Sequence, residues 1–439
     1  MQALYLHSKK CYNVKKIEGL YMISVNEVDE YKSDEVFKFN KKYNAFDEDL
    51  LICNYKVYID DKNKIKLDKK FFDFSLQYFN AFVHLYCFCN EYRNKNSVVD
   101  NLGFTMLYFG RHSLELIVKA IVIKNVKGGL AKCIKCKHSL ELLFSYLNGQ
   151  FSEEIFNEMK QYFKAIDLFD KKSDLFRYPF NVDFLKIYRN TCFNVIEMSL
   201  KLMYYYNVLH KEYLGVDYSE FDLEDIEYLS EIKENNEGFI ITTGSGFGNC
   251  YLWQFHEIDC HRQIEGYILV ANILWYSIKN NIGYNIELPL MYSLRHLIEM
   301  SMKNIILRVN PLLQKEIENN TQSDLCVSLI KEHQLSGILL DNVNSIMETL
   351  INEGDWPVEE YEEIKRLIQL IDDKDKNDDF FRYPISKAGT HYNYSDINLE
   401  AYCDIAYRCF SLINNSVDAV EVLNDILDEI YTDIAWYYK

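Results

Sequence analysis

The side chains best suited to chemistry form a charged stripe on an apolar segment. Arg111, Glu115 and Lys119 are four residues apart and would lie on one face of a helix, and residues 114–123 (LELIVKAIVI) are otherwise apolar. Unpaired charges inside a helical bundle are unfavourable, so these side chains need polar partners. Two interpretations follow: an internal salt-bridge network between helices, or a cationic pocket for the phosphate of a nucleotide or RNA.

The stripe belongs to a sequence pattern that occurs twice. RHSLELIVK begins at Arg111 and RHLIEMSMK at Arg295. Further along, IDLFDKKSDLFRYP (166–179) returns as IDDKDKNDDFFRYP (371–384), with nine of fourteen positions identical. A histidine followed two residues later by leucine lies between these landmarks in each copy. Three matched landmarks in the same order predict a duplicated module.

The candidate ligand-binding residues are the matched polar and tyrosine side chains of the two copies. They are Arg111, His112, Glu115, Lys119, His138, Arg177 and Tyr178 in the first copy, and Arg295, His296, Glu299, Lys303, His333, Arg382 and Tyr383 in the second. In both copies the tyrosine is followed by a proline, which restricts the backbone to a turn. We expect each charged stripe to meet the Tyr-Pro corner of its own copy.

Two further groups contain side chains that bind metals. Asp167, Asp170 and Asp174 would align on one side of a helix, as either a Mg²⁺ site or a solvated helix end. The segment 133–138 (CIKCKH) has zinc-ligand chemistry, but no second ligand pair follows and the second copy has no matching cysteines. The glycines of 244–249 (GSGFGN) lack the helix and lysine of a phosphate-binding loop. The sequence therefore predicts neither a resident metal nor a cofactor.

Long helices are expected to carry these residues. The chain has 439 residues with only five prolines and sixteen glycines, which favours uninterrupted helices. Apolar periodicity and start signals predict helices at 77–92, 102–125, 139–147, 152–169 and 182–213 in the first copy, and at 262–280, 286–309, 355–372 and 397–438 in the second. Before residue 70, short segments rich in β-branched and aromatic residues predict strands.

The predicted fold class is mainly α, and the chain divides into four parts. These are a small α+β domain at 1–70, a helical bundle at 71–213, an acidic linker with a short strand and a glycine-rich loop at 214–261, and a second bundle at 262–439. Duplicated modules often pair as two separate chains would, so we expect the bundles to form an internal pseudo-dimer.

Composition restricts the location and the partners of the chain. A net charge of −18 argues against a protein that coats nucleic acid, although it allows a small basic pocket. No apolar run is long enough to span a bilayer, and the amino terminus lacks the apolar core of a secretory signal. Twelve cysteines without framework spacing are typical of reduced thiols. These features predict a cytoplasmic protein without membrane contact.

The RHxxExxxK helix, the later His-x-Leu and the Phe-Arg-Tyr-Pro element resemble the HEPN-like helical bundles of bacterial defence and toxin–antitoxin proteins. The resemblance covers residues 71–210 and 250–437 and implies four- to five-helix bundles that pair around a cleft. Active members are similar to metal-independent ribonucleases with an Arg-x4–6-His motif, whose histidine is the acid or base and whose arginine stabilises the phosphorane. In this chain the matching arginine is Arg189, and Asn194 takes the position of the histidine.

The resemblance implies a bacterial defence protein of antiphage, abortive-infection or toxin–antitoxin type that recognises a nucleotide, RNA or protein trigger through the polar cleft. One alternative is an active ribonuclease whose acid–base histidine is His112 or His138, with Arg189 as a further catalytic candidate. Another is a non-catalytic subunit that binds a protein partner through an acidic, tyrosine-rich surface. Further copies of the chain, in a homo-oligomer, are also candidate partners.

Overall fold

The computed structural model describes residues 66–437, apart from short gaps. The gaps are 94–95, 181–183, 185–186, 189–190, 220, 235–237, 244–249, 254–259, 282–284, 320–328, 355–357, 376–377, 388 and 393–396. Most of the predicted α+β domain at 1–70 therefore lies outside the described residues, as do the glycine-rich segment and Arg189.

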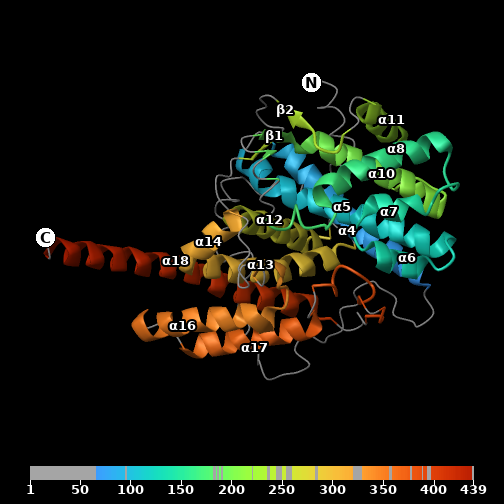
Figure 1. The fold of residues 1–439 in the computed structure, drawn as a ribbon. Coiled ribbons are helices and arrows are strands. Elements are labelled where there is room, and N and C mark those ends of the chain that lie inside the picture. The colour runs from blue at the N-terminus through green and yellow to red at the C-terminus, as the bar shows by residue number, and fades with distance from the viewer. Residues whose placement is uncertain are drawn as a thin grey trace.

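The described part of the chain is mainly helical, which confirms the predicted class (Figure 1). The first half contains α4 (Leu67–Glu91), α5 (Asn96–Asn125), α6 (Gly129–Cys136), α7 (Leu140–Ser145), α8 (Glu153–Asp170), α10 (Val195–Leu214) and α11 (Leu223–Glu234). The second half contains α12 (Cys260–Lys279), α13 (Glu287–Val309), α14 (Pro311–Glu318), the kinked turn η2 (Leu335–Leu339), α16 (Leu340–Gly354), α17 (Val358–Lys374) and α18 (Leu399–Tyr437).

Local signals explain several helix ends. The Ser152 side chain accepts a hydrogen bond from the backbone N–H of Ile155 (3.4 Å) and caps α8, as its sequence context predicts. Pro311 lies in the first turn of α14, where a missing N–H removes no helical hydrogen bond. The sequence interpretation missed α14, as well as α6, α11 and α16.

A small antiparallel sheet replaces part of one predicted helix. Its strands are β1 (Thr191–Asn194), β2 (Thr242–Thr243) and β3 (Cys250–Trp253), in the order β2-β1-β3. In β1, Cys192 is paired with Thr243 on one side and with Leu252 on the other. The predicted helix at 182–213 is therefore wrong over its first part. Backbone pairing with strands about fifty residues away decided this conformation, and periodicity within the segment could not reveal that pairing.

Helices α5 and α13 lie at the centre, and each carries one of the charged stripes. One continuous apolar core surrounds both. Helix α12 of the second half approaches α5 of the first at Gly266, where an added Cβ would lie 2.4 Å from Thr105 Oγ1 and 2.5 Å from the carbonyl oxygen of Asn101. Only glycine permits this approach, so Gly266 helps to hold the two halves together.

Polar contacts also join the halves through α4. His84 Nε2 and Ser277 Oγ are 2.6 Å apart, and the side-chain oxygen of Gln77 accepts a hydrogen bond from the backbone N–H of Leu288 (3.1 Å). The hydroxyl of Tyr78 donates to the carbonyl oxygen of Phe381 (3.2 Å). These buried contacts satisfy polar groups that would otherwise lose water on burial.

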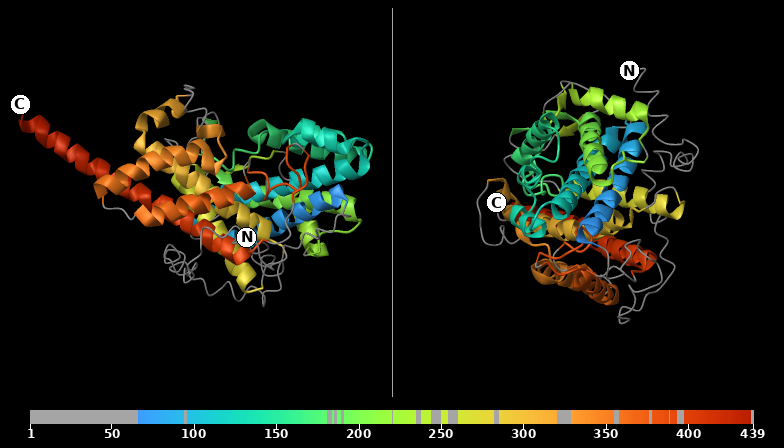
Figure 2. Two further views of the ribbon diagram at one scale, coloured as in Figure 1. Left: turned by 90° about the horizontal axis from the view of Figure 1, so that it is seen from below. Right: turned by 90° about the vertical axis from the view of Figure 1, so that its right-hand side faces the viewer.

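The last helix extends beyond the body of the molecule. The first part of α18 packs along α13, while its carboxyl end projects away from the other elements (Figures 1 and 2). Helices α16 and α17 lie beside α18 on the opposite side from the first half (Figure 2). Among the described helices, none combines the length and the hydropathy that a membrane crossing requires.

Candidate functional site

The Tyr-Pro corners cross between the two copies. The hydroxyl of Tyr178, in the first copy, donates to Glu299 Oε1 of the second copy (2.8 Å). The hydroxyl of Tyr383, in the second copy, donates to Glu115 Oε1 of the first (2.9 Å). The expectation that each stripe meets the corner of its own copy is therefore wrong. The turns that follow residues 166–174 and 371–379 place each tyrosine beside the central helix of the other copy.

The charged stripes pair internally at the spacing read from the sequence. Arg111 forms an ion pair with Glu115, and Lys119 Nζ lies 2.7 Å from Glu115 Oε1. In the second copy, Arg295 and Lys303 pair in the same way with Glu299, at 2.6 and 2.8 Å. All of these side chains are buried. The predicted requirement for partners is confirmed.

Two histidines complete these clusters. His138 Nδ1 lies 3.1 Å from Glu115 Oε1, and His333 Nδ1 lies 3.0 Å from Glu299 Oε1. Each is also within hydrogen-bond distance of the crossing tyrosine hydroxyl. Their side chains remain 29% and 30% exposed, so they connect the buried clusters to the surface.

The cationic surroundings keep the central carboxylates ionised. Burial favours the neutral form of Glu115, but Lys119, His138 and Arg111 together hold its pKa well below the ordinary value. Burial likewise opposes ionisation of Glu299, yet Lys303, the nearby histidine and the nearby arginine lower its pKa. Each carboxylate therefore acts as a permanent acceptor at neutral pH.

A pair of arginines from different copies lies between the two clusters. Arg177 and Arg382 both bind the carboxylate of Asp378, which Arg382 Nη1 reaches at 3.0 Å. Both guanidinium groups lie about 6 Å from the rings of Tyr108 and Tyr292. Arg177 Nε also donates to the Tyr292 hydroxyl (2.8 Å). Through this centre, the fourteen candidate binding residues form one connected network.

Sequence reasoning missed three members of this centre. Asp378 was overlooked because its matched position in the first copy is Ser173, so the repeat gave no signal. Tyr108 and Tyr292 do match, since each lies three residues before the arginine of its stripe, and this periodicity could have identified them.

The histidines adjacent to the arginines are structural. His112 and His296 are buried, and their Nε2 atoms lie 3.2 Å from the carbonyl oxygens of Arg382 and Arg177 respectively. A carbonyl can only accept, so each Nε2 carries the proton. Burial lowers both pKa values, that of His296 to about 3. Because His112 is neutral and enclosed, it is not placed to act on an external substrate.

The aspartates of the first copy do not form a metal site. Asp167 accepts hydrogen bonds from the backbone N–H groups of Leu140 and Glu141 at the start of α7 (3.0 and 3.1 Å). Asp170 accepts from two N–H groups of its own turn and pairs with Arg111, while Asp174 is half-exposed. The three aspartates therefore have separate partners and do not share an ion. Asp167 and Asp170 instead accept hydrogen bonds from backbone N–H groups, at the start of α7 and in the turn after α8.

The other metal-ligating groups are also poorly suited to cations. Glu299, His333 and Asp378 bring ligand atoms within 4.8 Å of one another. However, Lys303 Nζ and three arginines already pair with these carboxylates, so a further cation would meet strong repulsion. In the segment 133–138, whose side chains have zinc-ligand chemistry, burial raises the pKa of Cys133 to about 12, which disfavours the thiolate that zinc requires.

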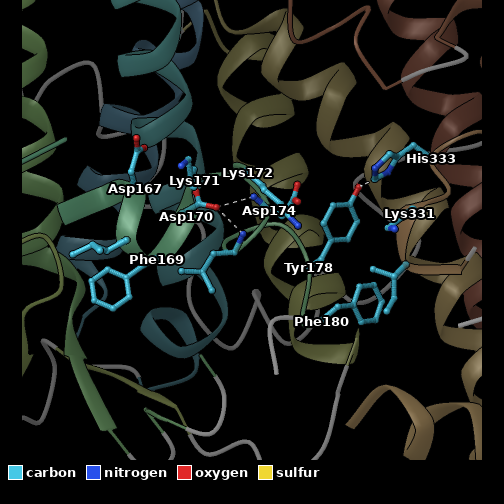
Figure 3. Close-up of a pocket in the computed structure, with 13 residues that line it drawn as sticks. Asp167, Phe169, Asp170, Lys171, Lys172, Asp174, Tyr178, Phe180, Lys331 and His333 are labelled. Atoms are coloured by element: carbon cyan, nitrogen blue, oxygen red, sulfur yellow. Dashed lines mark hydrogen bonds between the residues drawn. The ribbon is translucent and has the colours of Figure 1, made fainter. Parts of the chain in front are cut away.

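A pocket opens beside the second cluster (Figure 3). Its volume is about 540 Å³, and it lies between the turn after α8 and the segment before η2. Figure 3 shows the Tyr178 hydroxyl directed at His333, with Phe180 beside the tyrosine ring. The lining residues are Asp167, Leu168, Phe169, Asp170, Lys171, Lys172, Asp174, Leu175, Tyr178, Phe180, Ile330, Lys331 and His333.

Asn194, at the position where the resemblance implies a histidine, has a local structural role. Asn194 ends β1, and its side-chain oxygen accepts from the backbone N–H of Glu197 (3.1 Å) at the start of α10. Arg189 lies outside the described residues. Asn194 thus serves as a helix cap.

Comparisons of the chain with protein-family models, with curated proteins and with solved structures find no match.

Proposed function

We propose that the protein consists of two HEPN-like bundles and acts in bacterial defence by binding a nucleotide or RNA trigger without cleaving it. The observation that carries this proposal is the pocket beside His333, where cationic and aromatic side chains meet at the junction of the two copies. Most of the fourteen matched residues are buried in an ion-pair network, which supports a structural role for the network and leaves recognition to its exposed edge.

The pocket has the chemistry of an anion site. Lys171, Lys172 and Lys331 are exposed lining residues, and His333 is partly exposed. The lining aspartates offset this charge only in part, because Asp170 is paired with a buried arginine. Phosphate groups of a ligand would meet the lysine ammonium groups.

The same pocket offers a surface for a base. The accessible ring is that of Phe180, which is partly exposed and lies 6.0 Å from the buried ring of Tyr178 with an interplanar angle of 13°. Aromatic faces stack on bases without strong sequence preference. A nucleotide or an RNA end, which combines phosphate with a base, fits this pairing of features better than a purely inorganic anion does.

The test is a thermal-shift titration with nucleoside mono-, di- and triphosphates and with short oligoribonucleotides. A ligand that binds the native state raises the melting temperature, and the rise grows with the ratio of free ligand concentration to Kd. We expect Lys331→Ala and the double variant Lys171→Ala, Lys172→Ala to weaken the shift. Lys164→Ala removes an exposed lysine of α8 outside the pocket and serves as the control. A panel without any shift, or equal shifts in all variants, would refute the proposal.

A ribonuclease remains a second candidate because of one feature. His138 and His333 are partly exposed, and each is oriented by a carboxylate, as in a base with its orienting group. Incubation with total RNA in the absence of metal tests this function. Cleavage that His333→Ala or His138→Ala abolishes would favour the enzyme, whereas intact RNA at high protein concentration would exclude it.

A further inference from the structure

Helix α18 runs past the end of the helix on which it packs. Arg308, one residue before the end of α13, forms an ion pair with Glu421 of α18, with Nη1 3.5 Å from Oε1. Beyond this contact, residues 421–437 form a projecting end that leaves the body of the molecule (Figures 1 and 2). At a rise of about 1.5 Å per residue, the projecting end is about 25 Å long. It can therefore pack lengthwise against another helix.

The face that α18 buries in the body follows a seven-residue repeat. Its residues are alternately three and four positions apart, and all of them are buried. They are Ala406, Cys409, Ile413, Ser416 and Val420. In the body, α18 packs against α13, α16 and α17. Residues at this spacing share one side of a helix and form the seam between packed helices.

The same repeat continues without a break through the projecting end. The next positions of the series are Leu423, Leu427, Ile430, Ile434 and Tyr437, which are all apolar or aromatic. None of the described elements lies alongside the last turns of α18 (Figures 1 and 2). A contiguous apolar series outside the body of a protein marks a contact with another surface. The seven-residue spacing indicates that this surface is a helix.

The acidic residues of the projecting end are placed away from this seam. If the seam residues take heptad positions a and d, four acidic residues fall at the outer positions b, c and f. They are Glu421, Asp425, Asp428 and Glu429, whereas Asp433 borders the seam. The side chains of Glu421, Asp425 and Glu429 are exposed. Two copies of this helix can therefore meet while most of their like charges stay apart.

A membrane surface fits the projecting end less well than a second copy does. Residues 421–437 contain neither lysine nor arginine. Helices that lie on anionic lipid surfaces carry these residues on their polar face, because the surface attracts positive charge. An acidic helix is repelled by such a surface.

An antiparallel arrangement suits two copies best. The spacing of the seam reads the same in both directions, so position 423 would lie opposite position 434, and position 427 opposite position 430. Such self-complementarity is what a two-fold contact requires. A parallel pair would bring both bodies to the same end of the contact, where the net charge of −18 on each chain opposes their approach. The antiparallel pair keeps the bodies at opposite ends.

We propose that the protein is a homodimer in which the projecting ends of two α18 helices pack antiparallel along this seam. The contact is limited to residues 420–437, so each body folds as described and the dimer dissociates reversibly on dilution. This contact does not involve the pocket beside His333, and either proposal can fail without the other.

The first test is sedimentation equilibrium of the full chain over a wide range of protein concentrations. We expect the average mass to rise from 52.2 kDa towards twice that value, following a monomer–dimer equilibrium. A mass of 52.2 kDa at every concentration would overturn the proposal. That result is the one expected if another segment of this chain, or a different protein, covers the seam.

Two variants of the same helix separate the seam from its outer face. Leu427→Asp places one charge from each copy at the centre of the contact, and we expect only the monomer. Val422→Asp makes a similar change at heptad position c, where the side chain is 58% exposed, and should dimerise as the wild type does. Circular dichroism checks that both variants remain folded. A dimer that persists in Leu427→Asp, or equal loss in both variants, would contradict the assignment of the seam.

Small-angle X-ray scattering of the wild-type dimer tests the orientation. Bodies at opposite ends of the paired helices should give a distance distribution with two maxima and a largest dimension well above that of the monomer. A single maximum, as from two bodies in direct contact, would overturn the antiparallel arrangement.

Discussion

The carboxylate of Asp378 is bound by the guanidinium of Arg177, a residue 201 positions earlier in the chain and in the other copy of the repeat. Both side chains are buried. This ion pair is therefore a tertiary link between the halves, and its removal leaves charge inside a medium of low dielectric constant.

We expect Asp378→Asn to lower the free energy of unfolding by about 3–5 kcal/mol, because three arginines then lose one shared counter-charge. Urea unfolding followed by circular dichroism measures this loss. Adding Arg177→Met should recover part of it, since fewer buried charges remain unpaired. Purely additive losses would show that the two residues are not energetically coupled.

The crossing tyrosines should contribute through their hydroxyl groups. Tyr178→Phe and Tyr383→Phe each remove a donor from a buried carboxylate, and we expect a loss of about 1–3 kcal/mol for each. Tyr162→Phe is the matched control, because that hydroxyl is also buried but has no hydrogen-bond partner among the described residues. Equal effects in all three variants would argue that the hydroxyl contacts contribute little.

Buried neutral histidine makes stability depend on pH. The folded pKa of His296 is about 3 because of burial, against about 6.5 in the unfolded chain. The unfolded state therefore binds the proton first, and the contribution of this residue, complete above pH 6.5, is lost as the pH falls. At pH 5 the loss is about 2 kcal/mol.

The comparison of wild type with His296→Gln isolates this effect. We expect the wild type to lose about 2 kcal/mol more than the variant between pH 7.5 and pH 5 in urea unfolding. Asp170 and Asp375, whose burial raises their pKa to about 6, act in the opposite direction between pH 4 and 6, but they do so in both proteins. Identical pH profiles would contradict a neutral buried His296.

The two halves should depend on each other for folding. Fragments 1–256 and 257–439, divided within a segment outside the described residues, each lack the tyrosine that completes their own cluster. We expect neither fragment alone to unfold cooperatively, and co-expressed fragments to elute as a one-to-one complex in size-exclusion chromatography. A single fragment that folds alone as a monomer would show that the crossing contacts are dispensable.

Local patterns in the sequence were sufficient for the stripes and for most helices. The spacing of four residues predicted that Glu115 would pair with Arg111 and Lys119. The position of Ser152 before an amphipathic segment predicted that it would cap α8. Such contacts depend on residues close in sequence, so helix geometry alone determines them.

The contacts that join distant segments could not be derived in this way. The repeat showed that Tyr178 and Tyr383 are equivalent, but equivalence does not decide whether each contacts its own copy or the other. The strand β1 depends on partners far along the chain, and the residue that matches Asp378 in the first copy is a serine rather than a carboxylate. The tyrosine contacts, strand β1 and the role of Asp378 all depend on residues far apart in the chain, so a short stretch of sequence does not reveal them.

The exchange of corners has a consequence for how such a chain can arise. A polypeptide with a single copy could satisfy its glutamate only by trading tyrosines with a second molecule, so its folding would require encounter at sufficient concentration. Joining the copies covalently makes that encounter intramolecular. It also allows the two copies to diverge in sequence, because a mutation in one copy then leaves the other copy unchanged.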